Sequence, residues 1–217
     1  MASTLDELAR ALPDPHELRD RLRALAVLDA ICGTRHLTYS FTTSFSEGVA
    51  LGRYDNGAGD YYFVFFDGAE TLVRVFDHES DLSPYVNDGL WPGLVDGLPD
   101  RLQQYVQMEK LGDEDYPLIT LAIWHDGTGW KHGTPRPIDG IEPEPTDWPL
   151  SQVIAWSADT VAADRGRYWS RSLSATEIAP ILELRPLTRE LAETVNPEVD
   201  WAFVERVAAY VGLPIDG

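Results

Sequence analysis

The 217-residue sequence contains a single cysteine, Cys32, so no disulfide bond can form within the chain. Cys32 ends an apolar stretch with helical spacing, which favours a buried, inert thiol over a nucleophile. No apolar run approaches the 18 residues of a membrane-spanning helix. The first 15 residues also lack a basic segment followed by an apolar one, the pattern of a secretory signal. We therefore expect a cytoplasmic protein.

The sequence signatures of several enzyme classes are also missing. The chain has no G-x-S-x-G elbow, no G-x-G-x-x-G or Walker A loop, and no H-E-x-x-H pair. Pairs of carboxylates are abundant, but they are not diagnostic in a chain with 36 acidic residues. We predict no cofactor and assign no metal ligands or catalytic residues. Whether the protein is an enzyme stays open, and the balance is against it.

Basic residues are scarce, with 17 Lys and Arg against 36 Asp and Glu and a net charge of −19. From Asp55 to Asp100 there are ten acidic residues and one basic residue, Arg74. Such a surface repels nucleic-acid phosphates and anionic membranes, so neither is an expected partner. A basic protein would be attracted to it. The alternative is that the acidity serves only solubility.

The hydrophobic pattern predicts an α+β fold in a single domain over residues 1–217. Helical spacing follows a capping signal at Asp14-Pro15, and a period of two begins near His36. Two β-rich runs, residues 61–66 and 71–76, flank Asp67-Gly68 and predict a hairpin whose first strand is covered on both sides. In all we expect a mainly antiparallel sheet of five or six strands, over about 36–133.

Helices are expected before and after the sheet, and also within residues 92–110 and 148–169. The segment 135–149 holds five prolines in 15 residues and predicts a stiff loop, which is a possible sub-boundary of the domain. Rings at Trp148, Trp156, Tyr168 and Trp169 are expected in the core.

The segment Phe-Asp-His-Glu-Ser, residues 76–80, is the first candidate site. On a continuing strand Asp77 and Glu79 would share one face and His78 would point to the other, which makes a three-ligand metal site awkward. The oxygens of Asp77, Glu79 and Asp81 suit a hard cation, but the loop lacks an EF-hand pattern. A solvated loop and a partner-binding loop are the other readings. Acids beside exposed aromatic rings suit a protein interface, and the residues are Asp77, Glu79, Asp81, Tyr85, Asp88 and Trp91.

The second candidate lies in W-H-D-G-T-G-W-K-H-G, residues 124–133. His125 and His132 could face each other across a turn and share a metal with Asp126, although ordinary loop histidines are the simpler reading.

The stretch GDYYFVFFDGAETLVRVFDHESDLSPYVNDGLWPG, residues 59–93, resembles a set of bacterial proteins in which a strand pair ends in an FDHES…SPY segment. The likeness covers about residues 57–133, with an echo in LRPLTRELAETVNPE. It implies no catalytic residue, because no activity is known to us for that set. In its small size, acidity and α+β character the chain is also similar to the immunity proteins of bacterial toxin systems, which bind basic toxin domains.

Our leading hypothesis is a non-enzymatic acidic protein-binding module, immunity-like, that masks a basic partner protein. The alternative is a metal-dependent hydrolase that uses Asp77, His78 and Glu79 with His125 or His132. A structural protein without a discrete site is the third reading. The sequence identifies neither the partner nor the oligomeric state.

Overall fold

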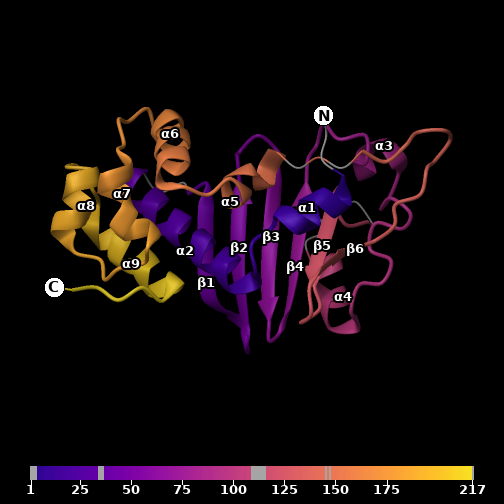
Figure 1. The fold of residues 1–217 in the computed structure, drawn as a ribbon, viewed down its shortest axis with the longest axis horizontal. Helices are drawn as coiled ribbons and strands as arrows, with labels where there is room; N and C mark the ends of the chain where they lie inside the picture. Colours follow the sequence, from indigo (N-terminus) through magenta and orange to yellow (C-terminus); the bar gives the residue numbers. More distant parts are fainter. Residues whose placement is uncertain (1–3, 34–36, 109–115, 145, 147, 217) are drawn as a thin grey trace. The chain divides into compact units, whose positions relative to one another are not determined.

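The computed structural model describes residues 4–33, 37–108, 116–144, 146 and 148–216. Its strands form one antiparallel six-stranded sheet in which neighbours in the chain are neighbours in the sheet (Figure 1). The predicted antiparallel sheet of five or six strands is therefore confirmed. The strands are β1 (Tyr39–Ser46), β2 (Val49–Asp55), β3 (Tyr61–Asp67), β4 (Glu70–Phe76), β5 (Leu121–His125) and β6 (Trp130–His132). Residue 36, where a strand was expected to begin, lies outside the described residues.

Helices in the described residues precede, interrupt and follow the strands, so the α+β class is confirmed. None of them is long and apolar enough to cross a membrane. They are α1 (Leu5–Ala11), α2 (Pro15–Cys32), α3 (Pro84–Asn87), α4 (Asp100–Val106), η1 (Trp148–Leu150), α5 (Ser151–Ile154), α6 (Ala158–Trp169), α7 (Ala175–Leu182), α8 (Arg189–Val195) and α9 (Trp201–Val211).

Two predicted helical segments are shorter than expected. Residues 92–97 form turns, and α4 begins only after Pro99. The segment 148–169 is interrupted because Ser157 has an extended backbone and caps α6, accepting a hydrogen bond from the Thr160 N–H. The prediction that four rings of this segment lie in the core is wrong, since Trp148 and Tyr168 are exposed and Trp156 and Trp169 are only half-buried.

The chain divides into two compact units. We call residues Met1–Pro15 and Tyr54–Ser151 the acidic unit, and residues His16–Arg53 and Gln152–Gly217 the helical unit. The acidic unit has 22 acidic and 6 basic residues, which gives a formal charge of −16. The helical unit has 14 acidic and 11 basic residues, which gives a formal charge of −3. The chain passes from the acidic unit into the helical unit after Ser151, close to the sub-boundary predicted in 135–149. The single domain predicted over 1–217 stays a prediction.

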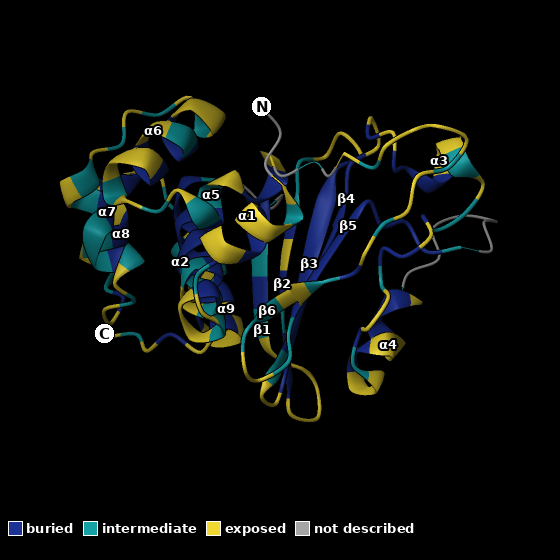
Figure 2. Cartoon of the chain, turned by 45° about the vertical axis from the view of Figure 1, so that its right-hand side comes forward, coloured by how far each residue is buried: buried dark blue, intermediate teal, exposed yellow. Residues whose placement is uncertain are grey.

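The β3–β4 hairpin is the core of the acidic unit. Seven residue pairs align the strands from Tyr61↔Phe76 to Asp67↔Glu70, around the predicted Asp-Gly turn. Every residue of β3 is buried, which confirms that this strand is covered on both sides (Figure 2). On one side the Phe65 ring stacks on Tyr105 of α4, with ring centres 4.4 Å apart.

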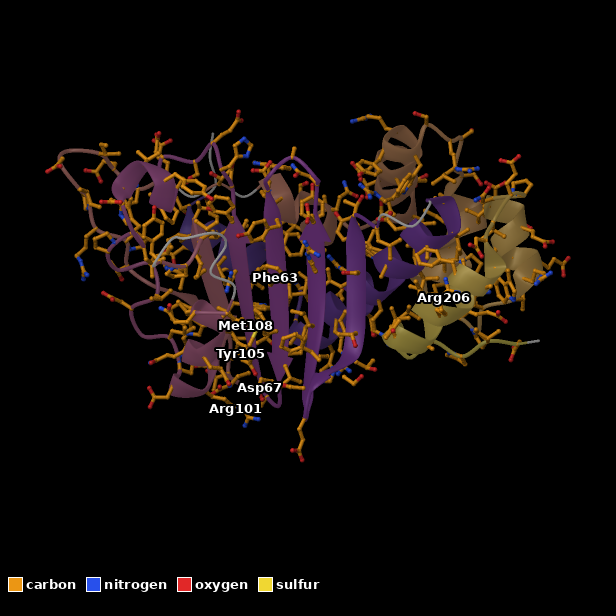
Figure 3. All side chains as sticks on the ribbon, turned by 180° about the vertical axis from the view of Figure 1, so that it is seen from behind. Phe63, Asp67, Arg101, Tyr105, Met108 and Arg206 are labelled. Atoms are coloured by element: carbon orange, nitrogen blue, oxygen red, sulfur yellow. The ribbon has the colours of Figure 1, made fainter. Side chains whose placement is uncertain are left out.

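Polar contacts at the turn of this hairpin attach α4. The Tyr105 hydroxyl donates to Asp67 Oδ2 at 2.8 Å and Arg101 Nε donates to Asp67 Oδ1 at 2.7 Å (Figure 3). The Arg101 hydrogen bond is the main reason that the pKa of Asp67 is lowered. Arg74 of β4 is buried and donates to the carbonyl oxygens of Tyr105 and Met108, both at 2.6 Å. The only basic residue between Asp55 and Asp100 is thus a structural cation.

The helical unit contains a buried ion pair between Asp29 of α2 and Arg165 of α6. Their Oδ1 and Nη1 atoms are 3.1 Å apart, and the Asp29 side chain is fully buried. Asp29 also accepts the Tyr39 N–H at 2.9 Å and the Trp169 indole N–H at 3.1 Å. The Arg165 guanidinium lies over the Tyr39 and Tyr168 rings. Burial raises the pKa of Asp29, and the charge of Arg165 opposes that rise.

Cys32, at the end of α2, is buried. Burial, with the nearby charge of Asp29, raises the pKa of the thiol to about 12. The prediction of a buried thiol is therefore confirmed, and a group with this pKa supplies little nucleophilic thiolate near neutral pH.

We predict that Arg165→Met destabilises the protein by about 3–5 kcal/mol, because it leaves the Asp29 carboxylate buried without its cation. Urea unfolding followed by circular dichroism measures this loss. Arg167→Met is the matched control, since Arg167 is an exposed residue of the same helix and its replacement should cost no more than about 0.5 kcal/mol. Equal losses for the two variants would contradict the assignment.

Candidate functional site

The predicted site residues lie in the segment that follows β4. The strand ends at Phe76, and the chain then turns twice, with Ser80 N–H donating to Asp77 O at 3.2 Å and Ser83 N–H donating to Ser80 O at 2.8 Å. Because the strand does not continue, the alternation expected for Asp77, His78 and Glu79 does not apply. The helix α3 follows, with Pro84 at its first position.

Asp77 faces inward and anchors this segment. It is only 5% exposed. Its carboxylate accepts the Glu79 N–H on Oδ1 and the Trp148 indole N–H on Oδ2, both at 3.0 Å, and its own N–H donates to Thr120 Oγ1 at 3.0 Å. The carboxylate is thus occupied by neighbouring donors, and its place among surface residues must be corrected.

Trp91 is buried too, at 1% exposure, so the exposed position expected for its ring is wrong. Its indole N–H donates to Arg136 O at 2.8 Å, and the Arg136 N–H donates to Pro92 O at 3.0 Å. The backbone around Gly93 and the backbone around Thr134 approach so closely that a Cβ on Gly93 would lie 2.0 Å from the carbonyl oxygen of Thr134. Trp91 therefore holds the Pro-rich loop and cannot anchor a partner.

The remaining predicted residues do reach the surface. Glu79, Asp81, Tyr85 and Asp88 are exposed, and Val86, which sequence reasoning did not select, is 62% exposed beside Tyr85 at 53%. The Tyr85 ring meets the edge of Phe76, with ring centres 5.8 Å apart. We call Glu79, Asp81, Tyr85, Val86 and Asp88 the α3 surface. Within the described residues, none of its three carboxylates forms an ion pair or hydrogen bond.

A second group of acids lies at the base of this segment. Oxygen or nitrogen atoms of Asp60, Asp77 and His78 lie within 4.8 Å of one another, the only such cluster among the residues described. Sequence reasoning missed Asp60. The hairpin register could have found it, because continuing the pairing Tyr61↔Phe76 by one step places Asp60 opposite Asp77.

Hydrogen bonds already occupy most of this cluster. Asp60 Oδ1 accepts the His78 backbone N–H at 3.0 Å and contacts the ring Nδ1 at 2.6 Å, while Asp60 Oδ2 accepts the Asn56 side-chain amide at 2.7 Å. These donors occupy lone pairs that a metal ion would need. These hydrogen bonds connect the residue before β3 to the segment after β4. We call the contact between Asp60 and His78 the clasp.

His125 and His132, the histidines of the second candidate site, lie elsewhere. His125 pairs with Thr71 in the register, six residues along β4 from Asp77, which corresponds to roughly 20 Å. His132 contacts Asp6 Oδ1 at 3.1 Å and Gly133 O at 2.6 Å. The residue opposite His125 on β6 is Trp130, so His125 and His132 are not paired, and Asp126 binds Lys131 instead. Neither histidine joins Asp77.

No family model, curated protein or solved structure matches the chain. The site is therefore interpreted from its own geometry.

The contact between His78 and Asp60 makes stability depend on pH. The hydrogen bond from Asp60, together with the charges of Asp60, Glu79 and Asp77, raises the pKa of His78 above its ordinary 6.5. Burial tends to raise the pKa of Asp60, but the hydrogen bonds from His78 and Asn56 lower it below 3.8 overall. Stability from His78 is lost as the pH rises through its raised pKa, and stability from Asp60 is lost as the pH falls through its lowered pKa.

We therefore predict that His78→Gln lowers the melting temperature most near about pH 5.5, where both groups are charged, and much less near about pH 9. Thermal unfolding of both proteins across this range measures the difference. His125→Gln is the control, because the described contacts of His125 include no carboxylate, and its effect should not grow as the pH falls to 5.5. A His78→Gln effect that also does not grow would contradict the clasp.

Proposed function

We propose that this protein is a non-enzymatic, acidic protein-binding module, with the character of a toxin-immunity protein, that masks a basic partner protein. The observation that carries the proposal is the segregation of charge. If acidity served only solubility, both units could share it, yet the acidic unit carries −16 of the total of −19. A field concentrated in this way attracts a positively charged protein.

The α3 surface supplies the features of a contact site within that unit. Its carboxylates, on Glu79, Asp81 and Asp88, are unpaired within the described residues, so basic groups of a partner need not break existing ion pairs. Tyr85 and Val86 are among the most exposed large apolar side chains of the described chain. An exposed aromatic side chain surrounded by charged residues is a common form of interface hot spot.

The mechanism would be steering followed by occlusion. Long-range attraction speeds the encounter, and the exposed apolar side chains of α3 then bury against the partner. The buried hairpin and the Asp77 anchor hold the segment in place, so little ordering is needed on binding. The partner's basic surface would then be covered.

The alternative, a metal-dependent hydrolase, has less support. It required His125 or His132 beside Asp77, and the strand register separates His125 from Asp77 by six residues along β4. The remaining group of Asp60, Asp77 and His78 is filled by internal hydrogen bonds.

We predict that the protein captures a basic protein from a lysate of the source cell at low salt. The triple variant Glu79→Gln, Asp81→Asn, Asp88→Asn should lose this capture, because the charges that face the partner are gone. Quantitative mass spectrometry of the retained proteins measures the loss. With the captured protein purified, the association rate should fall about tenfold or more between low and high salt.

The matched control is Glu193→Gln, Glu198→Gln, Glu205→Gln, which changes the net charge equally at exposed positions of the helical unit. It should retain the partner. Tyr85→Ala should weaken binding, whereas Tyr210→Ala, at the exposed Tyr210 of the helical unit, should not. Equal capture by both triple variants, or an association rate that ignores salt, would overturn the proposal.

A further inference from the structure

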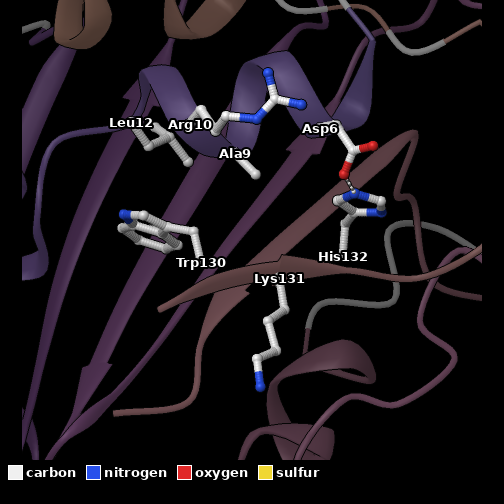
Figure 4. A pocket seen from close by; sticks show the side chains of 7 residues that line it. All are labelled: Asp6, Ala9, Arg10, Leu12, Trp130, Lys131 and His132. Carbon is white, nitrogen blue, oxygen red and sulfur yellow. Dashed lines mark hydrogen bonds and ion pairs between the residues drawn. The ribbon is translucent and has the colours of Figure 1, made fainter. Parts of the chain in front are cut away.

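A pocket of about 660 Å³ lies between α1 and β6 (Figure 4), and no residue of the α3 surface lines it. Its size is within the range of small-molecule sites. Residues Asp6, Ala9 and Arg10 come from one face of α1, because residues three and four apart in a helix share a face. Trp130 and His132 of β6 form the opposite wall.

The floor of the pocket is apolar and fixed. Ala9 and Leu12 are buried, and the Trp130 side chain is half-buried. The Trp130 indole N–H donates to the carbonyl oxygen of Pro13 at 2.8 Å, which sets the plane of the ring. A flat apolar group that enters the pocket therefore meets a ring already held in position.

Arg10 places a cation at the rim, and no hydrogen bond or ion pair engages it within the described residues. Hydrogen bonds with Thr4 lower the pKa of Glu7, and the charge of Arg10 adds to this effect, but neither acidic neighbour on α1 forms a hydrogen bond with Arg10 within the described residues. Asp6 contacts His132 Nε2 at 3.1 Å, and Glu7 accepts the Thr4 N–H at 2.8 Å in a capping box. Arg10 is exposed, so its guanidinium keeps its full set of donors for a ligand.

A basic side chain without an ion-pair partner is unusual in the acidic unit, in which acidic residues outnumber basic residues by 22 to 6. Arg74 donates to buried carbonyl oxygens, and Arg101, Lys131 and Arg136 pair with Asp67, Asp126 and Asp96. Among the described basic residues of the unit, Arg10 alone has no such partner. An arginine without a hydrogen-bond partner, on a pocket whose lining also includes Ala9, Leu12 and Trp130, points to a ligand with an anionic group and an apolar body.

We propose that this pocket binds an aromatic carboxylate. The flat ring would lie against Trp130, Ala9 and Leu12, and the carboxylate would accept the paired N–H groups of Arg10, the fork geometry that suits it best. A single negative charge fits better than a phosphate dianion, because Asp6 and the charge of the unit repel additional negative charge. This site is independent of the proposed protein partner.

Isothermal titration calorimetry with 2-naphthoate tests the proposal, with 2-naphthamide as the uncharged analogue and 2-naphthyl phosphate as the dianion. We expect the carboxylate to bind more tightly than both. Arg10→Gln should weaken its binding about tenfold or more, since a charge-assisted pair is lost, and Arg10→Lys should restore part of it. In an NMR spectrum the Trp130 indole signal, assigned with Trp130→Phe, should shift on titration.

Arg136→Gln is the matched control, because Arg136 is an exposed arginine of the same unit that pairs with Asp96 outside the pocket. It should leave naphthoate binding unchanged. The proposal is overturned if naphthoate does not bind, if the amide or the phosphate binds as well, or if Arg10→Gln and Arg136→Gln have equal effects. An unshifted Trp130 signal during saturation would likewise place the ligand elsewhere.

Discussion

The pairing of β3 with β4 fixes most of the geometry of the acidic unit. Its register brings Asp67 to the turn, where Asp67 binds Arg101 and Tyr105 and so attaches α4. At the other end the same register sets Asp60 opposite Asp77, and the clasp with His78 follows. A slip by one residue would turn every side chain to the other face, and it would separate Asp67 from Arg101 and Tyr105.

This constraint also separates two kinds of acid that the sequence presents alike. Asp60, Asp67 and Asp77 are buried at the ends of the hairpin and are satisfied by N–H and O–H donors. Glu79, Asp81 and Asp88 follow within a few residues and face solvent. The first group holds the segment and the second group gives it charge. A binding surface made in this way is rigid at its base and unoccupied at its rim.

The sequence was sufficient to predict the elements whose signals are local. The Asp67-Gly68 turn between two β-rich runs predicted the hairpin, and the unbroken apolar run of β3 predicted its burial. It was not sufficient where a distant segment decides the outcome. Trp91 looks like an exposed ring in its own loop, but Arg136, 45 residues later, accepts its N–H. Asp60 is an intermediate case. The sequence analysis did not select it, but the predicted hairpin, extended by one residue pair, would have placed it beside Asp77.

The division into two units has a consequence for synthesis on the ribosome. The acidic unit consists of an early segment and residues 54–151, so its parts are all available once the chain has grown past Ser151. The helical unit is different, because α2 and β1 are made early but α6, which carries the cation for the buried Asp29, is made after the whole acidic unit. Arg165 follows Asp29 by 136 residues, so the ion pair cannot form until the acidic unit has been made, and the acidic unit is expected to fold first. The ion pair therefore belongs to a late stage of assembly, after the acidic unit has been made and before α7, α8 and α9 complete the helical unit.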